Sequence, residues 1–174
     1  MMQDWRLRRA TAADAPAVAM VAAASFLETF AGILPGEDIV AHCARNSAAE
    51  KFAVWADDPA SVVTVAEHPD GLAPVGYSLI TTPDLPIDPL PGDVELRRIY
   101  TLSLTRGTGL GHRLMALALD DAAALGAKRV LLGVLGTNVR ARSFYEREGF
   151  ILAGTRRFNV GAGWYDDVIY ARAL

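Results

Sequence analysis

The sequence has little cysteine and no long hydrophobic run, and each absence excludes a class of protein. Cys43 is the only cysteine among the 174 residues, so we expect neither an internal disulfide nor a thiolate cluster for zinc. The longest apolar stretch, residues 17–27, is rich in alanine and shorter than the roughly 20 residues that a membrane-spanning helix needs. The first ten residues lack the apolar run of a signal peptide. We therefore expect a single domain over residues 1–174, cytoplasmic, with no membrane partner and no metal.

The sequence also lacks a basic surplus. It holds 17 basic and 20 acidic side chains, a formal net charge of −3. The charge is divided unevenly: residues 1–96 hold 5 basic and 14 acidic side chains (net −9), and residues 97–174 hold 12 and 6 (net +6). The balance excludes a uniformly basic nucleic-acid binder. The asymmetry indicates that the two parts of the chain meet different partners.

Hydrophobic periodicity predicts strands that alternate with helices. Predicted strands lie at 5–9, 61–66, 75–80, 94–102, 129–134, 150–158 and 164–171, and predicted helices at 15–30, 38–46, 48–57, 109–125 and 138–148. Asp14 is placed to cap the first helix. The segment 83–92 contains four prolines, which exclude a regular element and favour a surface lid or rim. The pattern predicts an α/β fold with a mixed sheet and helices on its faces.

A glycine-rich turn, RGTGLGH at residues 106–112, connects a predicted strand to a predicted helix. Glycines let the main chain approach a ligand closely, and the free N–H groups of a helix start attract anions such as phosphate. The turn lacks the Gly-Lys-Ser/Thr ending of a P-loop, and His112 stands where a dinucleotide fingerprint needs its third glycine. Taken alone, the turn is equally compatible with a tight connection that binds nothing.

Two motifs together resemble the acyl-CoA site of the GCN5-related N-acetyltransferases. Arg106, Gly109 and Gly111 match that family's (Arg/Gln)-x-x-Gly-x-(Gly/Ala) signature, and the stretch from Asn138 to Phe-Tyr-Glu-Arg-Glu-Gly-Phe at 144–150 looks like its second landmark. The resemblance implies a mixed, mostly antiparallel sheet of about seven strands with helices on both faces. It also implies acetyl-CoA as co-substrate. The cofactor-binding residues that it implies are Ile99, Tyr100, Thr101, Arg106, Gly107, Thr108, Gly109, Leu110, Gly111, His112, Asn138 and Arg147, with main-chain pairing to pantetheine at Ile99 and Thr101.

Acetyl transfer to an amine needs a base for the amine, a donor for the carbonyl oxyanion and a proton for the departing thiolate. Tyr145 matches the family's general acid; the alternative is a core aromatic beside Phe144. We favour Glu95 as the base, acting through water; the alternative is an ion pair with a neighbouring arginine. The main-chain N–H of Thr101 is the candidate oxyanion donor.

Softer similarities favour the bacterial polyamine (spermidine/spermine) N-acetyltransferase branch. They lie at 26–30, 95–100, 132–134 and 154–161. The resemblance assigns residues 1–92 to the acceptor and residues 93–174 to acetyl-CoA, and an acidic groove would concentrate a cationic amine. Alternatively, the acids at 57, 58, 84 and 88 only cap helices and solubilise loops. A protein N-terminus or lysine as acceptor, and a catalytically silent CoA-binding regulator, stay open. The family also implies a possible homodimer, with Trp164 and Tyr165 either at its interface or in the core.

Overall fold

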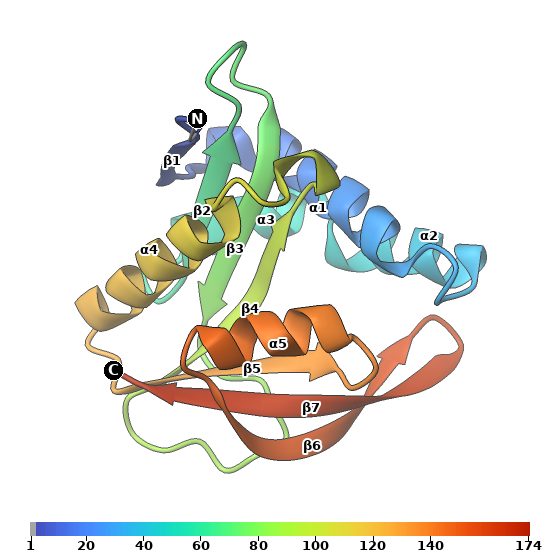
Figure 1. Ribbon diagram of the computed structural model, residues 1–174, viewed down its shortest axis with the longest axis vertical. Coiled ribbons are helices and arrows are strands. Elements are labelled where there is room, and N and C mark those ends of the chain that lie inside the picture. Colours follow the sequence, from blue (N-terminus) through green and yellow to red (C-terminus); the bar gives the residue numbers. More distant parts are fainter. Residues whose placement is uncertain (1–2) are drawn as a thin grey trace.

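Seven strands form one sheet in the order β1-β2-β3-β4-β5-β7-β6 (Figure 1). The structure is a computed structural model that describes residues 3–174. Its strands are β1 (Arg6–Arg9), β2 (Val62–Glu67), β3 (Pro74–Thr81), β4 (Asp93–Thr101), β5 (Arg129–Leu135), β6 (Ile151–Val160) and β7 (Gly163–Ala173). Within the described chain only β4 and β5 pair in parallel. The predicted mixed, mostly antiparallel sheet is confirmed.

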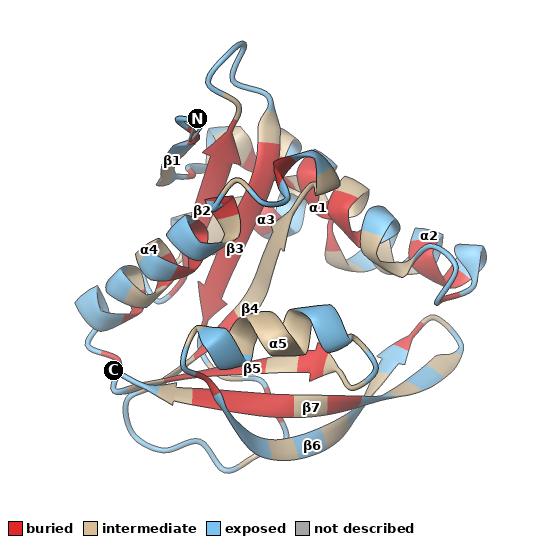
Figure 2. Cartoon of the chain, in the orientation of Figure 1, coloured by how far each residue is buried: buried red, intermediate tan, exposed pale blue. Residues whose placement is uncertain are grey.

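Helices cover both faces of the sheet, as the sequence predicts. They are α1 (Ala15–Phe30), α2 (Gly36–Asn46), α3 (Ala49–Asp57), α4 (Leu110–Ala124) and α5 (Val139–Arg147), with two short 3-10 helices, η1 (Ala12–Asp14) and η2 (Ser103–Thr105). On one face, Val18 and Val21 of α1 pack with Tyr77 and Leu79 of β3. The core of the other face is built around α4 and extends to Phe144 and Tyr145 of α5. Strands β2 and β3 are buried along almost their whole length, whereas β6 is largely exposed (Figure 2).

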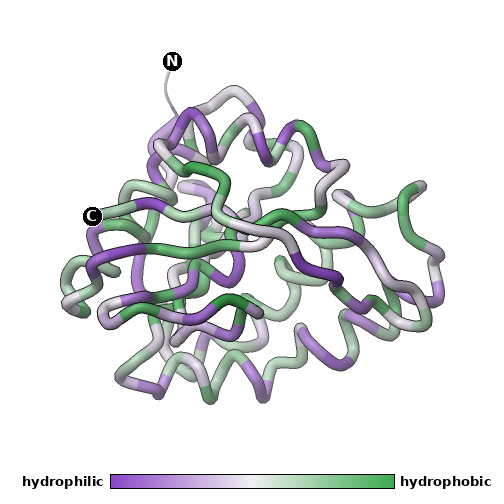
Figure 3. The backbone as a smooth tube through the Cα atoms, turned by 90° about the horizontal axis from the view of Figure 1, so that it is seen from below, coloured by the Kyte–Doolittle hydropathy of each residue, from purple (hydrophilic) through white to green (hydrophobic). Residues whose placement is uncertain are grey.

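The most apolar helical segment packs into the core. Residues 12–30 form a 19-residue helical segment with a hydropathy of 1.2, long and apolar enough by composition alone to cross a membrane. In the structure its buried side chains, among them Val18, Val21 and Phe26, pack against the sheet and neighbouring helices. Along the described chain, hydrophobic and hydrophilic stretches alternate (Figure 3). These contacts assign α1 the role of a core helix.

The predicted cap of α1 needs correction. Asp14 does not cap α1 with its side chain. Its carboxylate instead accepts hydrogen bonds from both terminal nitrogens of Arg8, at 2.9 and 2.8 Å, and from the main-chain N–H of Thr11 at 2.8 Å. The reason is that η1 precedes α1 and turns Asp14 back toward β1, where the partly exposed guanidinium of Arg8 offers a stronger partner than a helix N–H.

Of the proline-rich segment 83–92, expected as a lid or rim, only Asp84 reaches the lining of the cleft, so the segment is part of its rim and not a lid. Leu85 and Ile87 pack against Leu131, Ile169 and Ala171. These side chains lie on the face of β5 and β7 opposite α5, because the alternate residues of β5, Val130 and Leu132, belong to the core on the α4 and α5 side. The segment therefore supplies the apolar cover that no helix provides there.

The feature of the fold that positions the site is the separation of β4 from β5. The two strands pair only at Asp93–Glu95 with Arg129–Leu131. Beyond that point the two strands diverge. Helices α4 and α5 lie on the same face of the sheet, α4 near β4 and α5 over β5 (Figure 1). One edge of the C-terminal half of β4 is therefore left without a partner strand.

Candidate active site

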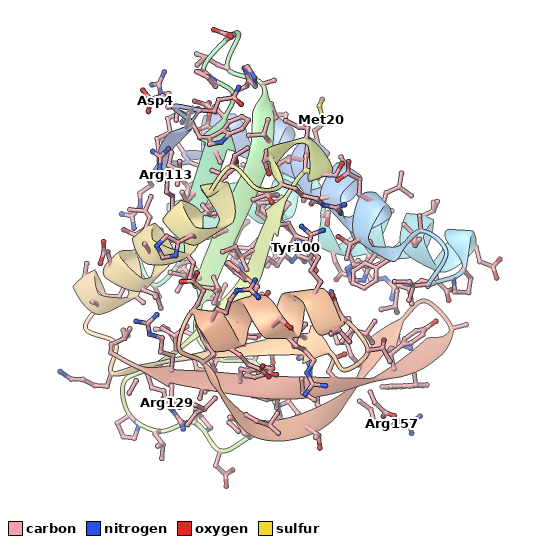
Figure 4. The ribbon with its side chains drawn as sticks, viewed as in Figure 1. Asp4, Met20, Tyr100, Arg113, Arg129 and Arg157 are labelled. Atoms are coloured by element: carbon pink, nitrogen blue, oxygen red, sulfur yellow. The ribbon has the colours of Figure 1, made fainter. Side chains whose placement is uncertain are left out.

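A cleft of about 990 Å³ opens where β4 and β5 separate. Its lining comes from segments distant in the sequence: α1, α2 and α3 at one end, the 106–112 turn and α5 at the other, β4 between them, and the β6–β7 hairpin. Figure 4 shows Tyr100, one of the lining residues, beside β4 on the side that faces α5. We call the region around the 106–112 turn and α5 the turn end of the cleft. The region between α1, α2 and the β6–β7 hairpin is called the hairpin end.

The turn end has the geometry of an anion site. Gly107 and Gly109 have φ of +74° and +82°, which L side chains rarely adopt. No atom lies within 4 Å of the position that a Cβ would take at either residue, so the main chain faces open space. The first N–H groups of α4 have no intrahelical acceptor, and no side chain caps the helix. Arg106, Arg140 and Arg147 line the same end.

All but one of the predicted cofactor-binding residues line the cleft. The exception is Thr108, whose hydroxyl accepts a hydrogen bond from Trp5 Nε1 at 2.9 Å and donates one to the Thr105 carbonyl at 2.6 Å. Its side chain therefore ties the turn to the N-terminal segment, so the prediction of Thr108 as a ligand applies only to its main chain. Leu110 is 0% exposed, so only its main chain is available to a ligand.

Two further predicted residues have structural partners. The His112 Nδ1 lies 2.8 Å from a carboxylate oxygen of Glu148, at the exposed rim of the turn end. The Asn138 side-chain oxygen accepts the N–H of Ala141 at 3.2 Å and so caps α5. Asn138 thereby fixes the position of the helix that carries Arg140, Tyr145 and Arg147.

The open edge of β4 directs main-chain groups into the cleft. Leu102 donates its N–H to the carbonyl of Val75 in β3. Along an antiparallel strand, alternate residues direct their N–H and C=O groups to opposite edges. Tyr100 therefore faces β3 as Leu102 does, and Ile99 and Thr101 face the cleft. The prediction for the main chain of Ile99 and Thr101 agrees with this geometry.

Tyr145 projects from α5 into the cleft while its ring packs on the core. Its ring centroid lies 6.0 Å from that of Phe150 and 6.3 Å from that of Tyr170. Burial, and to a smaller extent the neighbouring Tyr100, raise the pKa of its hydroxyl well above the usual value. The hydroxyl is therefore protonated at neutral pH and able to donate. The ring contacts agree with the alternative of a core aromatic, and the role of the hydroxyl as general acid stays a prediction.

Glu95 lies at the point where β4 and β5 part, and its side chain is 3% exposed. One carboxylate oxygen accepts the main-chain N–H of Asp84 at 3.0 Å. Burial raises the pKa of the carboxyl, and Arg97 and the Asp84 N–H oppose that rise. The predicted alternative, an ion pair of Glu95 with an arginine, is not found, because Arg97 pairs with Asp84 instead, at 2.6 Å.

Comparison with known proteins agrees with this geometry. The sequence profile of the acetyltransferase (GNAT) family matches residues 29–150. The chain belongs to this family. An uncharacterised N-acetyltransferase of Mycobacterium tuberculosis (strain ATCC 25618 / H37Rv) is 37% identical over 161 residues, which cover 92% of this chain and 98% of that protein. The mycothiol acetyltransferase of Beutenbergia cavernae is 44% identical over 61 residues, covering 33% of this chain and 20% of that protein.

Solved structures share the fold of this GNAT acyltransferase. An N-acetyltransferase from Thermoplasma acidophilum in complex with coenzyme A superposes with a TM-score of 0.77 at 18% identity, covering 98% of this chain and 99% of that one. A Salmonella typhimurium protein described as an acetyltransferase, with acetyl-CoA as its cofactor, gives a TM-score of 0.69 at 22% identity, covering 98% and 94%.

The hairpin end of the acetyltransferase cleft is not the acidic groove expected from the sequence. Of the four acids weighed for it, only Asp84 lines the cleft, and it is paired with Arg97. Arginines line this end together with the acids. Arg98 lies against the rings of Phe52 and Trp55, and Arg156 lies against the carboxylate of Asp167 at 3.2 Å.

Sequence reasoning missed the Arg156–Asp167 pair, and no local signal could have revealed it. The two residues face each other in the β6–β7 register, eleven positions apart in sequence. The sequence left open whether Trp164 and Tyr165 lie at a dimer interface or in the core. In the structure the two residues differ: Trp164 is 60% exposed, and Tyr165 lines the cleft. Within residues 3–174, no three His, Cys, Asp or Glu side chains are grouped to hold a metal ion.

Proposed function

We propose that this enzyme transfers the acetyl group of acetyl-CoA to the primary amine of a small molecule, by direct attack while both substrates are bound. The observation that carries the proposal is the cleft between β4 and β5. It has an anion-binding turn at one end, a buried carboxylate beside β4, and a protonated tyrosine facing the cleft. The solved proteins of the same fold that hold coenzyme A or acetyl-CoA support the assignment of the co-substrate.

The turn end fits the chemistry of coenzyme A. The cofactor carries a pyrophosphate and a 3′-phosphate, which favour helix N-termini and the forked donors of arginine. The lining residues from 99 to 147 include Arg106, Arg140 and Arg147 and no acidic side chain. We infer that these arginines and the first N–H groups of α4 hold the phosphates. The exposed edge of β4 at Ile99 and Thr101 would pair with the pantetheine arm.

In the reaction acetyl-CoA supplies the acetyl group as a thioester. A C–N bond forms between the amine and the carbonyl carbon, the C–S bond breaks, the amine loses a proton and the sulfur gains one. Glu95 accepts the proton of the amine through water, because its raised pKa makes it a stronger base than an exposed carboxylate. Tyr145 donates a proton toward the sulfur, and the Thr101 N–H stabilises the developing oxyanion.

The hairpin end favours a small acceptor over a protein chain. The N–H of Ala162, at the tip of the β6–β7 hairpin, donates to the side chain of Asp38 in α2 at 3.2 Å. Ile39, Leu34 and Val160 pack behind this contact. The hairpin tip is therefore tied to α2 at this end of the cleft, which supports a small acceptor over an extended peptide. The acceptor region combines residues 1–92 with β6 and β7, and the co-substrate region lies within 93–174.

Within small amines, the polyamine class has support from the sequence. The resemblance to the polyamine branch favours a cationic acceptor, whereas the net charge of −9 over residues 1–96 does not, because most of those acids lie outside the cleft. Thiol release from acetyl-CoA, followed with polyamines, amino acids, aminoglycosides and N-terminal peptides, tests the proposal. Turnover with small amines is expected. Turnover with peptides alone contradicts a small acceptor, and acetyl-CoA binding without any turnover identifies a regulator.

We also propose that the enzyme forms a homodimer through the edge of β6. Ile151 and Leu152 on this edge strand are 70% and 58% exposed, and Trp164 adds a third exposed apolar side chain on the hairpin. Light scattering should give twice the 18.6 kDa mass of the chain. A Leu152→Lys variant should give the monomer mass.

A further inference from the structure

The charged side chains on the acceptor side of the cleft are not all joined in ion pairs. Two ion pairs account for four of them, Arg97 with Asp84 at 2.6 Å and Arg156 with Asp167 at 3.2 Å. Glu95 has no cation partner among the described residues, and Arg98 has no carboxylate partner there. Burying a charge without a partner is costly. Glu95 and Arg98 therefore face the cleft without an ion pair, as do Lys51 and Glu28, whose carboxylate accepts hydrogen bonds from Ser103.

Arg98 is held rigidly although it lacks a carboxylate. One of its terminal nitrogens donates to the main-chain oxygen of Asn46 at 2.7 Å, at the end of α2. Its guanidinium lies 5.6 Å from the ring centroid of Phe52 and 5.4 Å from that of Trp55. Burial and the nearby Arg98 bring the pKa of His42 to about 4, so this neighbouring ring is neutral at pH 7. Arg98 is thus a fixed cation whose surroundings supply no full negative charge.

Arg156 is accommodated by a glycine. Gly133 lies within β5, where glycine weakens a strand and often marks the close approach of another group. A Cβ at residue 133 would lie 2.7 Å from a terminal nitrogen of Arg156 and 3.0 Å from its central carbon. The guanidinium therefore occupies the space of the missing side chain. Asp167 holds it through Nε, and its central carbon lies 4.8 Å from the Phe158 ring centroid.

This anchoring leaves the terminal nitrogens of Arg156 without a hydrogen bond to another side chain. Of its five N–H groups, the structure pairs only the one on Nε with another side chain, Asp167. Its side chain is 16% exposed and lines the cleft together with Glu95. A guanidinium held in this manner is suited to a carboxylate or a similar planar anion, because its donors are fixed before the ligand arrives.

We propose that the acceptor is an amine that also carries an anionic group, as in an amino acid or a close analogue. Arg156 and Arg98 bind the anion, and Glu95 faces the amine. The proposal rests on the proposed function and names its acceptor class. A polyamine satisfies Glu95 but brings positive charge toward two fixed guanidinium groups, which disfavours binding.

Matched pairs of acceptors test the proposal. Each pair consists of an amino acid and the amine that remains when its carboxylate is removed: lysine and cadaverine, ornithine and putrescine, phenylalanine and phenethylamine, methionine and 3-methylthiopropylamine. In the best pair we expect kcat/KM to be roughly 10- to 100-fold higher for the amino acid, which is the range for a lost charged hydrogen bond. Equal or better turnover of the decarboxylated amine in every pair that reacts overturns the proposal in favour of a cationic acceptor.

Variants of Arg156 assign the preference to the site. Arg156→Gln should raise KM for the amino acid roughly 10-fold or more, with a smaller effect on kcat, and should abolish the preference within a pair. Arg156→Lys keeps a cation for Asp167 and should give an intermediate KM. Arg157→Gln is the matched control, because Arg157 lies outside the lining of the cleft, on the outer side of the hairpin (Figure 4). An unchanged preference in a folded Arg156→Gln variant overturns the role of Arg156.

Failure of the proposed function gives a different result. If none of the amines releases thiol from acetyl-CoA, the transfer reaction is refuted, and the subsite is then decided by calorimetric titration of the same amino acids into the protein. Saturable binding that Arg156→Gln abolishes and Arg157→Gln retains supports the subsite. Absence of binding to the wild-type protein overturns it.

Discussion

Replacing Glu95 by glutamine should lower activity strongly without lowering stability above neutral pH. Glu95 is buried, and the desolvation of its carboxylate raises its pKa. A group with a raised folded pKa stabilises the fold only below that pKa, and this stabilisation is lost as the pH rises through it. At neutral pH and above, the buried charge therefore costs stability, and Glu95→Gln removes that cost.

The magnitudes follow from the contacts. The glutamine oxygen can still accept the Asp84 N–H, so the loss at this hydrogen bond is at most about 1 kcal/mol, or roughly 2–4 °C in Tm for a domain of this size. Removal of the buried charge opposes this loss, so Tm at pH 8 should be level or higher. Loss of a general base should lower kcat by about 10²- to 10⁴-fold.

The assay is a pH profile of kcat/KM paired with thermal unfolding at the same pH values. Wild-type kcat/KM should rise as Glu95 loses its proton, and this acidic limb should be absent from Glu95→Gln. Glu50→Gln, an exposed change on α3, serves as the control. A Glu95→Gln variant that retains wild-type kcat and the same acidic limb would refute the reasoning.

Three further predictions have separate expected outcomes. Tyr145→Phe keeps the ring contacts with Phe150 and Tyr170 and should lower kcat roughly 100-fold at unchanged Tm. An unchanged steady-state kcat would show that Tyr145 is only a core aromatic. Gly109→Ala and Gly126→Ala impose the same backbone strain, at φ of +82° and +84° without a nearby atom. Each should cost about 1–2 kcal/mol in urea unfolding, but only Gly109→Ala should raise KM for acetyl-CoA.

The third prediction concerns acid stability and is tested with Asp14→Asn. Hydrogen bonds from Arg8 and the Thr11 N–H hold the pKa of the Asp14 carboxyl well below its usual range. This stabilisation is present above the unfolded pKa and is lost as the pH falls toward the folded one. Asp14→Asn should therefore lose about 1–3 kcal/mol in urea unfolding at pH 7. A loss just as large at about pH 3 would contradict the assignment, because protonation begins below about pH 4 in the unfolded chain.

The glycine turn and the strand pattern could be predicted because their signals are local. Gly107 and Gly109 are where the main chain needs positive φ, and a sequence shows such positions directly. The divergence of β4 from β5 is not local, and only the family resemblance implied it. The side-chain partners of Asp14 and Thr108 could not be predicted from the sequence. Asp14 binds Arg8 and Thr108 binds Trp5, and both contacts depend on how the segments fold together.

The character of the acceptor region could not be predicted from charge totals. The net charge of −9 over residues 1–96 suggested an acidic groove, but most of those acids lie outside the cleft. The guanidinium of Arg156 reaches the cleft because β6 pairs with β7, β7 with β5, and Gly133 leaves room. Arg156 lies beside Gly133 only when β5, β6 and β7 pair in the correct register. Amino-acid composition does not specify that register.

The central claim is acetyl transfer to a small amine in the cleft between β4 and β5. It is tested most directly by incubating the enzyme with acetyl-CoA and the amine panel, then measuring free thiol and the mass of each amine in the same sample. The account predicts that one acceptor gains a single acetyl group in an amount equal to the thiol released, and that Glu95→Gln and Tyr145→Phe slow both together. Thiol release without an acetylated amine, or equal rates in wild type and both variants, would contradict it.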